Sequence, residues 1–201
     1  MKTKAGLILA ALALISAPIF AQGGNSEVSA NFTGNFQNQA SGLGVTDSSS
    51  YSGGFLANYR YHFNRWSALE TNYGYTRFSQ TYNNGTSTSV SQANVHEATF
   101  AYQFTFGVPS DARFRPFAEA GTGALFFTGP ITGGSTAGGL GQARPVFLYG
   151  GGVEYKLKGP FAAQLGYRGL VYKAPDFTVP TQLTNAKAHM AEPYVGLTFR
   201  F

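Results

Sequence analysis

Three histidines are the only imidazole side chains in the chain, and they are the first candidates for acid–base or metal chemistry. His62, His96 and His189 lie far apart in the sequence and match none of the short spacings that typify zinc sites. The absence of cysteine removes thiolate metal sites, redox pairs and disulfide bonds. We therefore expect no catalytic, cofactor-binding or metal residues, no cofactor and no enzyme. A serine–histidine–acid site assembled from distant segments stays open as an alternative.

Carboxylates and basic side chains are the second set with chemical potential, because paired carboxylates act as general acids and bases. They recur at alternate positions of segments that are rich in aromatic residues. Five acids stand against four bases, so their charges nearly cancel, as a buried ion network requires. We favour such a structural network over catalysis. Its predicted members are Arg60, Glu70, Glu97, Glu119, Glu154, Lys156, Arg168, Glu192 and Arg200.

The segments that carry these ions alternate with a period of two. In the last ten residues, EPYVGLTFRF, apolar side chains occupy every second position and end on Phe201. This alternation is typical of β-strands with one apolar face. Because no segment shows a sustained helical period, the predicted fold class is all-β. Seven further predicted strands cover residues 28–36, 51–61, 66–76, 95–104, 115–127, 145–157 and 161–172.

The connections between these strands alternate between long and short along the chain. Successive hairpins of this kind form an antiparallel meander with the long loops on one rim and the tight turns on the other. The strands also have about the 9–11 residues that cross a bilayer at a tilt. The sequence therefore predicts an eight-stranded antiparallel up-and-down transmembrane β-barrel with four long extracellular loops and three short periplasmic turns.

The polar strand faces decide between two kinds of barrel. A lipocalin-like soluble barrel turns its apolar face inward, whereas a membrane barrel turns it outward to lipid. The faces that carry the ions also carry many glycines, among them Gly74, Gly121 and Gly166. Glycine weakens an exposed strand, but small residues make room for long charged side chains in a narrow bore. The pattern favours a membrane barrel with a charged, plugged lumen.

The N-terminus has the pattern of a secretory signal peptide. MKTK is followed by an apolar stretch and then by the small residue Ala21. A membrane-anchor helix is the alternative, although the stretch is short for a span and Pro18 interrupts its end. We expect residues 1–21 to be the signal peptide and residues 22–201 to be one outer-membrane β-barrel domain that makes up the mature chain.

The ending YVGLTFRF resembles the C-terminal signal of bacterial outer-membrane proteins, at Gly196, Phe199 and Phe201. The stretches RPFAEAGTGALFF and LGYRGLVY resemble strands of small barrels related to the membrane domain of outer membrane protein A. This resemblance implies residence in the bacterial cell outer membrane and insertion by the barrel-assembly machinery. It also implies contact with outer-membrane lipid and lipopolysaccharide, and basic residues near the long loops could pair with its phosphates.

Composition and family together give the functional expectation. The net charge of +5 falls to +3 without Lys2 and Lys4 of the leader, and no basic run points to nucleic acid. We expect a structural or cell-surface interaction role, with a surface ligand that the sequence does not identify. The alternatives are a narrow porin-like channel and a lipid A-modifying outer-membrane enzyme. A His-x-Ser pattern of the kind such enzymes carry is absent.

Overall fold

A computed structural model of the chain describes residues 25–83, 85, 88–107, 112–128, 141–175 and 185–201. The predicted signal peptide lies outside these residues. Ten strands form one antiparallel sheet, and eight of them build the barrel wall. The strands are β1 (Ser26–Gln37), β2 (Ala40–Gly42), β3 (Val45–Ser49), β4 (Ser52–His62), β5 (Ser67–Asn83), β6 (Thr88–Thr105), β7 (Phe114–Thr128), β8 (Gln142–Lys156), β9 (Phe161–Lys173) and β10 (Lys187–Arg200).

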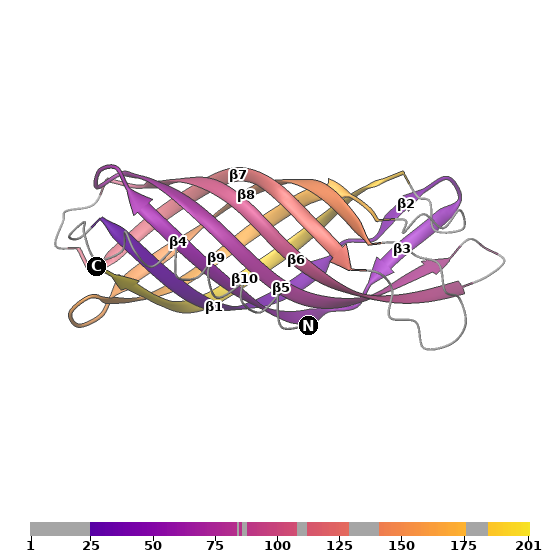
Figure 1. Cartoon of the computed structure of the whole chain (residues 1–201), viewed down its shortest axis with the longest axis horizontal. Coiled ribbons are helices and arrows are strands. Elements are labelled where there is room, and N and C mark those ends of the chain that lie inside the picture. The colour runs from indigo at the N-terminus through magenta and orange to yellow at the C-terminus, as the bar shows by residue number, and fades with distance from the viewer. Residues whose placement is uncertain (1–24, 84, 86–87, 108–111, 129–140, 176–184) are drawn as a thin grey trace, which may run out of the picture.

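The barrel closes because the first and last strands of the wall pair with each other. β1 is antiparallel to β10, with Val28 opposite Phe199, and β5–β6 pairing completes the ring. Two backbone hydrogen bonds between Ser26 and Phe201, at 2.9 and 3.3 Å, extend this seam by one more residue pair. The predicted eight-stranded up-and-down barrel is therefore confirmed, and every strand of the wall has a partner on both sides (Figure 1).

The two ends of the barrel differ. The connections 63–66 and 157–160 lie at one end together with the end of β6, the start of β7 and Phe201, and we call this the turn end. At the opposite end, the loop end, strands continue through two of the segments that the sequence assigned to loops. β5 and β6 stay paired up to Asn83 and Thr88, and β3 pairs with the extended part of β5. The alternating pattern stops there because an extension beyond the wall needs no apolar face.

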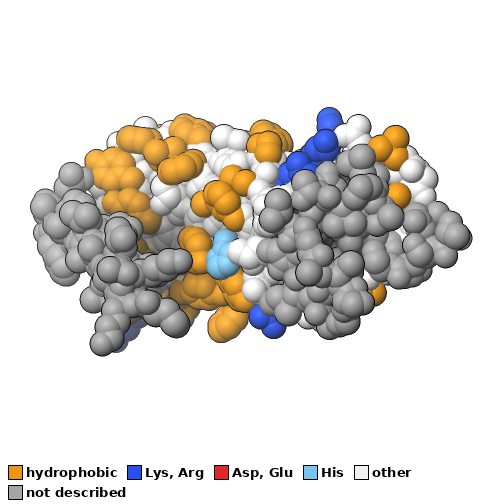
Figure 2. Space-filling view, turned by 45° about the vertical axis from the view of Figure 1, so that its right-hand side comes forward, with side chains coloured by type: hydrophobic (Ala, Val, Ile, Leu, Met, Phe, Trp, Pro, Cys, Tyr) orange, Lys and Arg blue, Asp and Glu red, His pale blue; other side chains and the backbone are white. Residues whose placement is uncertain are grey.

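The apolar strand faces point outward. Phe100 is 58% exposed, while Arg168 on the polar face of β9 is completely buried. Aromatic side chains gather on the outside near the turn end, where Phe199 contacts Phe161 and Phe201. Figure 2 shows the apolar band on the outer surface. This arrangement excludes the lipocalin-like alternative, in which the apolar faces would point inward. Within the described residues, no helix is long and apolar enough to span a membrane.

The backbones of β1 and β10 approach so closely at the closing seam that position 196 requires glycine. A Cβ atom placed on Gly196 of β10 would lie 2.2 Å from the carbonyl oxygen of Ala30 in β1. Such a contact is possible only if the two strands move apart. Gly53 of β4 has no comparable neighbour, because its nearest atom would be 4.0 Å away.

We predict that Gly196→Ala destabilises the barrel by about 1–3 kcal/mol, the usual cost of forcing extra volume into a packed site. Unfolding in urea, followed through the fluorescence of the single tryptophan, Trp66, measures the change. Gly53→Ala is the matched control and should leave the midpoint unchanged. Equal midpoints for the two variants would contradict a tight seam at Gly196.

Candidate functional site in the barrel interior

The first ionic cluster of the lumen surrounds Arg60 of β4, near the turn end. Strand register places Glu27 of β1 and Glu70 of β5 directly opposite Arg60 on its two neighbouring strands. The guanidinium lies 2.9 Å from a Glu27 oxygen and 2.7 Å from a Glu70 oxygen. It also hydrogen-bonds Glu154 of β8, which reaches it from the opposite wall of the ring. One buried cation therefore ties four strands together across the bore.

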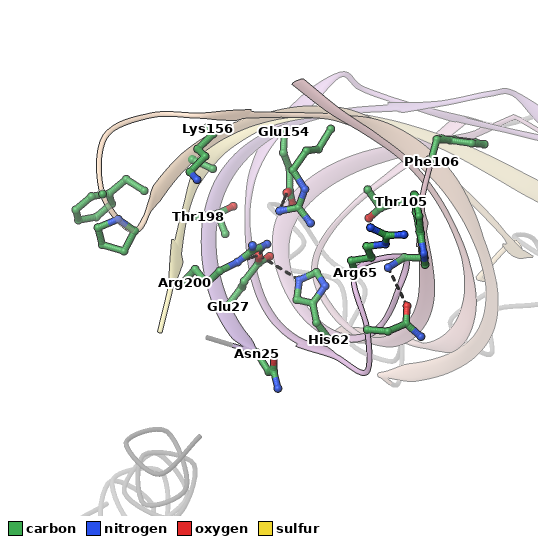
Figure 3. Close-up of a pocket in the computed structure, with 17 residues that line it drawn as sticks. Asn25, Glu27, His62, Arg65, Thr105, Phe106, Glu154, Lys156, Thr198 and Arg200 are labelled. Atoms are coloured by element: carbon green, nitrogen blue, oxygen red, sulfur yellow. Dashed lines mark hydrogen bonds and ion pairs between the residues drawn. The ribbon is translucent and has the colours of Figure 1, made fainter. Parts of the chain in front are cut away.

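Further side chains extend this cluster to the turn end. Glu27 binds Arg200 of β10, and its Oε1 lies 3.1 Å from the Nε2 of His62. Figure 3 shows Glu27, His62 and Arg200 pointing toward one another just inside the mouth of the barrel. Arg115 approaches the free side of Glu154 at 3.6 Å. The Arg60 guanidinium also lies 5.6 Å from the ring centre of Phe117, within range of a cation–π interaction.

The second ionic cluster surrounds Arg168 of β9, nearer the loop end. Arg168 is completely buried and hydrogen-bonds Glu97 of β6, which reaches it across the bore. Register places Glu192 of β10 beside it, with 3.4 Å between a carboxylate oxygen and Nε. That distance is a charge contact without hydrogen-bond geometry, since both atoms lack a hydrogen-bond partner. The Arg168 cluster is therefore less completely hydrogen-bonded than the Arg60 cluster.

Amide side chains occupy the layer between the two clusters. Asn31 donates to Asn58 at 2.5 Å, and Asn58 donates to Glu70 at 2.9 Å. Gln164 donates to Asn31 from the other side, also at 2.5 Å. These bonds connect the walls at a level where no ion pair does so. A hydrogen-bonded chain thus runs from Gln164 through Asn31 and Asn58 to Glu70 of the Arg60 cluster.

One carboxylate in this network lacks a partner. Glu119 of β7 is 5% exposed, forms no ion pair among the described residues, and its Oε1 has no hydrogen-bond partner. A buried carboxylate that is neither paired nor fully hydrogen-bonded is costly. Glu70 and Glu97 are its like-charged neighbours. The two ionic clusters and Glu119 together contain six glutamates and four arginines, counting Glu27 and Arg115, so acids outnumber bases there.

The structure brings together eight of the nine predicted ionic residues inside the barrel. Lys156 is the exception, because it is exposed where β8 ends and forms no ion pair in the described part of the chain. Alternation does put it on the face of Glu154, but β8 ends at Lys156, whose side chain lines the open cavity at the turn end. Sequence reasoning missed Glu27 and Arg115, which occupy strand ends. Glu27 precedes Val28, where the first predicted strand began, although alternation already placed it on the polar face.

The lumen changes character toward the loop end, where the charged residues that the sequence predicted for the interior give way to apolar side chains. Buried apolar side chains fill this part of the bore: Phe78, Val95, Leu125, Phe127, Val146, Leu148, Leu170, Tyr172 and Met190. They continue the inward alternation of the same strands, so that Gly123 is followed by Leu125 and Phe127 on one face. We call this set the apolar layer. Tyr172 keeps its hydroxyl satisfied by donating to Gln37 at 2.9 Å.

The three histidines lie in different places. His62 faces the lumen beside Glu27, whereas the other two lie on the outer side of the wall. His96 is hydrogen-bonded to the Tyr73 hydroxyl at 2.9 Å and His189 to the Tyr149 hydroxyl at 2.8 Å. Among the described residues, no three His, Cys, Asp or Glu side chains are grouped so that they could hold a metal ion.

The predicted assembly residues lie together on the closing strand. Gly196 faces the lumen against Ala30 of β1, and Phe199 faces outward and is 41% exposed. Phe201 stacks on Phe199, with 5.8 Å between ring centres. Their recognition by the assembly machinery stays a prediction.

The turn end opens into a cavity of about 470 Å³. Its walls include the Glu27–Arg200 pair, His62, and the turn residues Arg65 and Trp66. The cavity reaches Glu154 (Figure 3), whose carboxylate is paired with the buried Arg60. The barrel interior therefore has an open vestibule at the turn end, and buried side chains fill it beyond that cavity.

An aromatic outer surface, a closed wall and an ionised interior define a transmembrane β-barrel of the bacterial outer-membrane type. A family model described as outer membrane protein beta-barrel domain matches residues 7–201, and the chain belongs to this family. The protein is therefore a bacterial outer-membrane protein. A search of curated protein sequences gave no match.

Solved structures of small outer-membrane barrels share the fold. The outer membrane protein OprG of Pseudomonas aeruginosa is 12% identical, with a TM-score of 0.66 over 90% of this chain and 97% of that one. Neisserial surface protein A is 16% identical, with a TM-score of 0.59 over 88% and 97%. The attachment invasion locus protein Ail of Yersinia pestis, in complex with the heparin analogue sucrose octasulfate, is 16% identical, with a TM-score of 0.50 over 90% and 100%. At these identities the likeness is one of fold.

Glu119 has no ion pair within the described residues whereas Glu97 is paired with Arg168, so replacing each glutamate by glutamine should change stability in opposite directions. Glu119→Gln removes a buried charge that has no ion pair, so we expect it to stabilise the barrel by about 1 kcal/mol or more. Glu97→Gln removes a carboxylate that holds Arg168, so we expect it to destabilise by about 3–5 kcal/mol. Urea midpoints in lipid vesicles measure both. Glu119→Gln as destabilising as Glu97→Gln would show that Glu119 has an essential partner.

Proposed function

We propose that the protein is a closed outer-membrane barrel with a structural or cell-surface interaction role, and that its interior is a plug. The Arg60 cluster carries this proposal. A single guanidinium contacts carboxylates on both of its neighbouring strands and on the opposite wall, so its ion pairs cross the bore. A path for a hydrated solute requires these contacts to break, and leaving one partner of a buried pair uncompensated costs about 3–5 kcal/mol. Catalysis is not part of the proposal.

The apolar layer supports the same conclusion at the other end. Phe78 and Phe127 come from β5 and β7 and are almost completely buried, at 1% and 2% exposure. An ion that passed the polar network would have to lose its hydration among these side chains, which is strongly unfavourable. The two fillings lie in series along the bore. Loosening one of them leaves the other in place.

The strand extension at the loop end supports a role outside the membrane. We define the extension as β2, β3 and the parts of β5 and β6 beyond Phe78 and Ala93 (Figure 1). Paired strands hold it in register with the wall, from Phe78 opposite Ala93 to Asn83 opposite Thr88. In the described part of the chain, residues 88–93 of β6 have a strand partner only on the β5 side. An open strand edge can pair with an edge of another molecule.

A narrow channel is the second candidate, and the turn-end cavity is the observation that favours it. This cavity of about 470 Å³ is lined by Arg200 and Arg115, so a small solute can reach both side chains from the turn end. The unpaired Glu119 lies deeper in the bore and weakens the network there. Together they give a partial route that stops at Arg60.

Conductance in planar bilayers separates the two candidates. We predict no discrete steps for the unaltered protein and none for Arg60→Ala, because the apolar layer still fills the bore. Combining Arg60→Ala with Arg168→Ala, Phe78→Ala and Phe127→Ala, which removes both ionic clusters and part of the apolar layer, should produce steps. Heat-modifiable mobility on gels verifies that each variant is folded. Discrete steps from the unaltered, folded protein would establish the channel instead.

The extension makes a separate prediction about contacts between cells. Removing residues 79–92 and joining Phe78 to Ala93 through Asn-Gly should leave the wall intact, because these residues are directly opposite and a two-residue turn suits that register. We expect expression of the unaltered protein to speed the settling of cell suspensions, and the shortened variant to settle as cells with an empty vector do. Equal settling for both proteins would place any surface contact elsewhere.

A further inference from the structure

The outer wall carries a groove at the loop end that the lumen does not explain. It has a volume of about 400 Å³ and crosses the four neighbouring strands β7 to β10. Its lining is apolar except at its rim, where two lysines stand. The lining residues are Thr122, Pro145, Val146, Phe147, Val171, Tyr172, Lys173 and Lys187, of which the buried Val146 and Tyr172 also belong to the apolar layer.

The strand register explains why the wall is hollow there. Pairing between β8 and β9 ends at Val146 opposite Tyr172, and Pro145 has no N–H with which to continue the ladder. Beyond that point β8 pairs only with β7 in the described part of the chain. The carbonyl of Val146 accepts a hydrogen bond from the Thr122 hydroxyl at 3.0 Å. The floor of the groove is therefore apolar, and the Val146 carbonyl already has a hydrogen-bond partner.

The two lysines at the rim are placed against each other. Lys173 of β9 and Lys187 of β10 are directly opposite in the strand register, and both are exposed. Like charges directly opposite on paired strands are destabilising. Neither lysine forms an ion pair with an acid in the described residues. An anion that contacts both lysines would offset the repulsion between their charges.

The depth of the lysines fits the headgroup region of the membrane. The outward face of β9 is apolar or glycine from Phe161 to Val171, which matches the about 9–11 residues of a membrane-crossing strand. Lys173 is the next outward residue and Lys187 lies beside it, on the extracellular side. Figure 2 shows basic side chains where the apolar band meets the loop end, and no acidic side chain among the described residues visible on this face.

We infer that this groove binds one phosphorylated glycolipid of the outer leaflet, of the lipopolysaccharide class. An acyl chain lies over Pro145, Phe147 and Val171, and a phosphate accepts charge-assisted hydrogen bonds from Lys173 and Lys187. The inference rests on the membrane location of the barrel and on the groove. It is independent of whether the lumen is plugged.

Native mass spectrometry of the full chain in mild detergent tests this binding. The probes are bis-phosphorylated lipid A, the same lipid without phosphates, and phosphatidylglycerol. We expect one bis-phosphorylated lipid A bound per barrel, at least tenfold tighter than either comparison lipid. The double variant Lys173→Gln/Lys187→Gln should lose at least tenfold in affinity for lipid A.

Two controls keep the outcome specific. Lys156→Gln/Lys158→Gln makes the same charge change at the turn end, where both lysines are exposed, and should bind as the unaltered protein does. Val171→Trp fills the groove without changing charge and should weaken binding, with folding verified by heat-modifiable mobility. If both lysine double variants lost the same affinity for lipid A, the effect would be due to net charge alone and the proposal would be wrong. Equal binding of phosphatidylglycerol, or no bound lipid A, would also overturn it.

Discussion

The buried guanidinium of Arg60 is the interaction on which the interior of this barrel depends. A closed wall of eight strands leaves a bore too narrow for free solvation, so every inward side chain must find its partners within the wall. Arg60 does so by meeting Glu27 and Glu70 across the register and Glu154 across the bore. These pairs need one alignment of four strands, because a slip of one residue would turn the ions toward lipid. The ions thus specify the register as well as fill the space.

The same closure explains the outside. Lipid provides no hydrogen-bond partner for the backbone, so the seam between β1 and β10 has to be complete to its last residue. Phe199 and Phe201 sit at that seam, where they combine backbone pairing with an aromatic contact at the membrane boundary. At the other end the wall is less regular. β8 and β9 part above Val146 while β5 and β6 continue outward, so the loop end offers both a groove and an extension.

The two halves of the interior stabilise the fold in different ways. Near the turn end, paired ions and amides give direction and register, and their net contribution to stability is modest because burial removes their hydration. Near the loop end, the apolar layer supplies hydrophobic burial and close packing. Glu119 lies among the ions without a partner, which indicates that the polar half is not optimised for stability alone.

Alternation along the chain determined which side chains face lipid and which face the bore, since the period of a strand is fixed by its backbone. It placed Phe100 outside and Arg168 inside, and the alternating connection lengths gave the up-and-down order. Tertiary structure decided which ions meet, because Glu154 reaches Arg60 from four strands away around the ring, and no local spacing encodes that distance. It also excluded Lys156, included Glu27, and gathered Phe78, Phe127 and Met190 into one layer. Faces follow from local geometry, whereas partners follow from closure and strand stagger, which involve the whole ring at once.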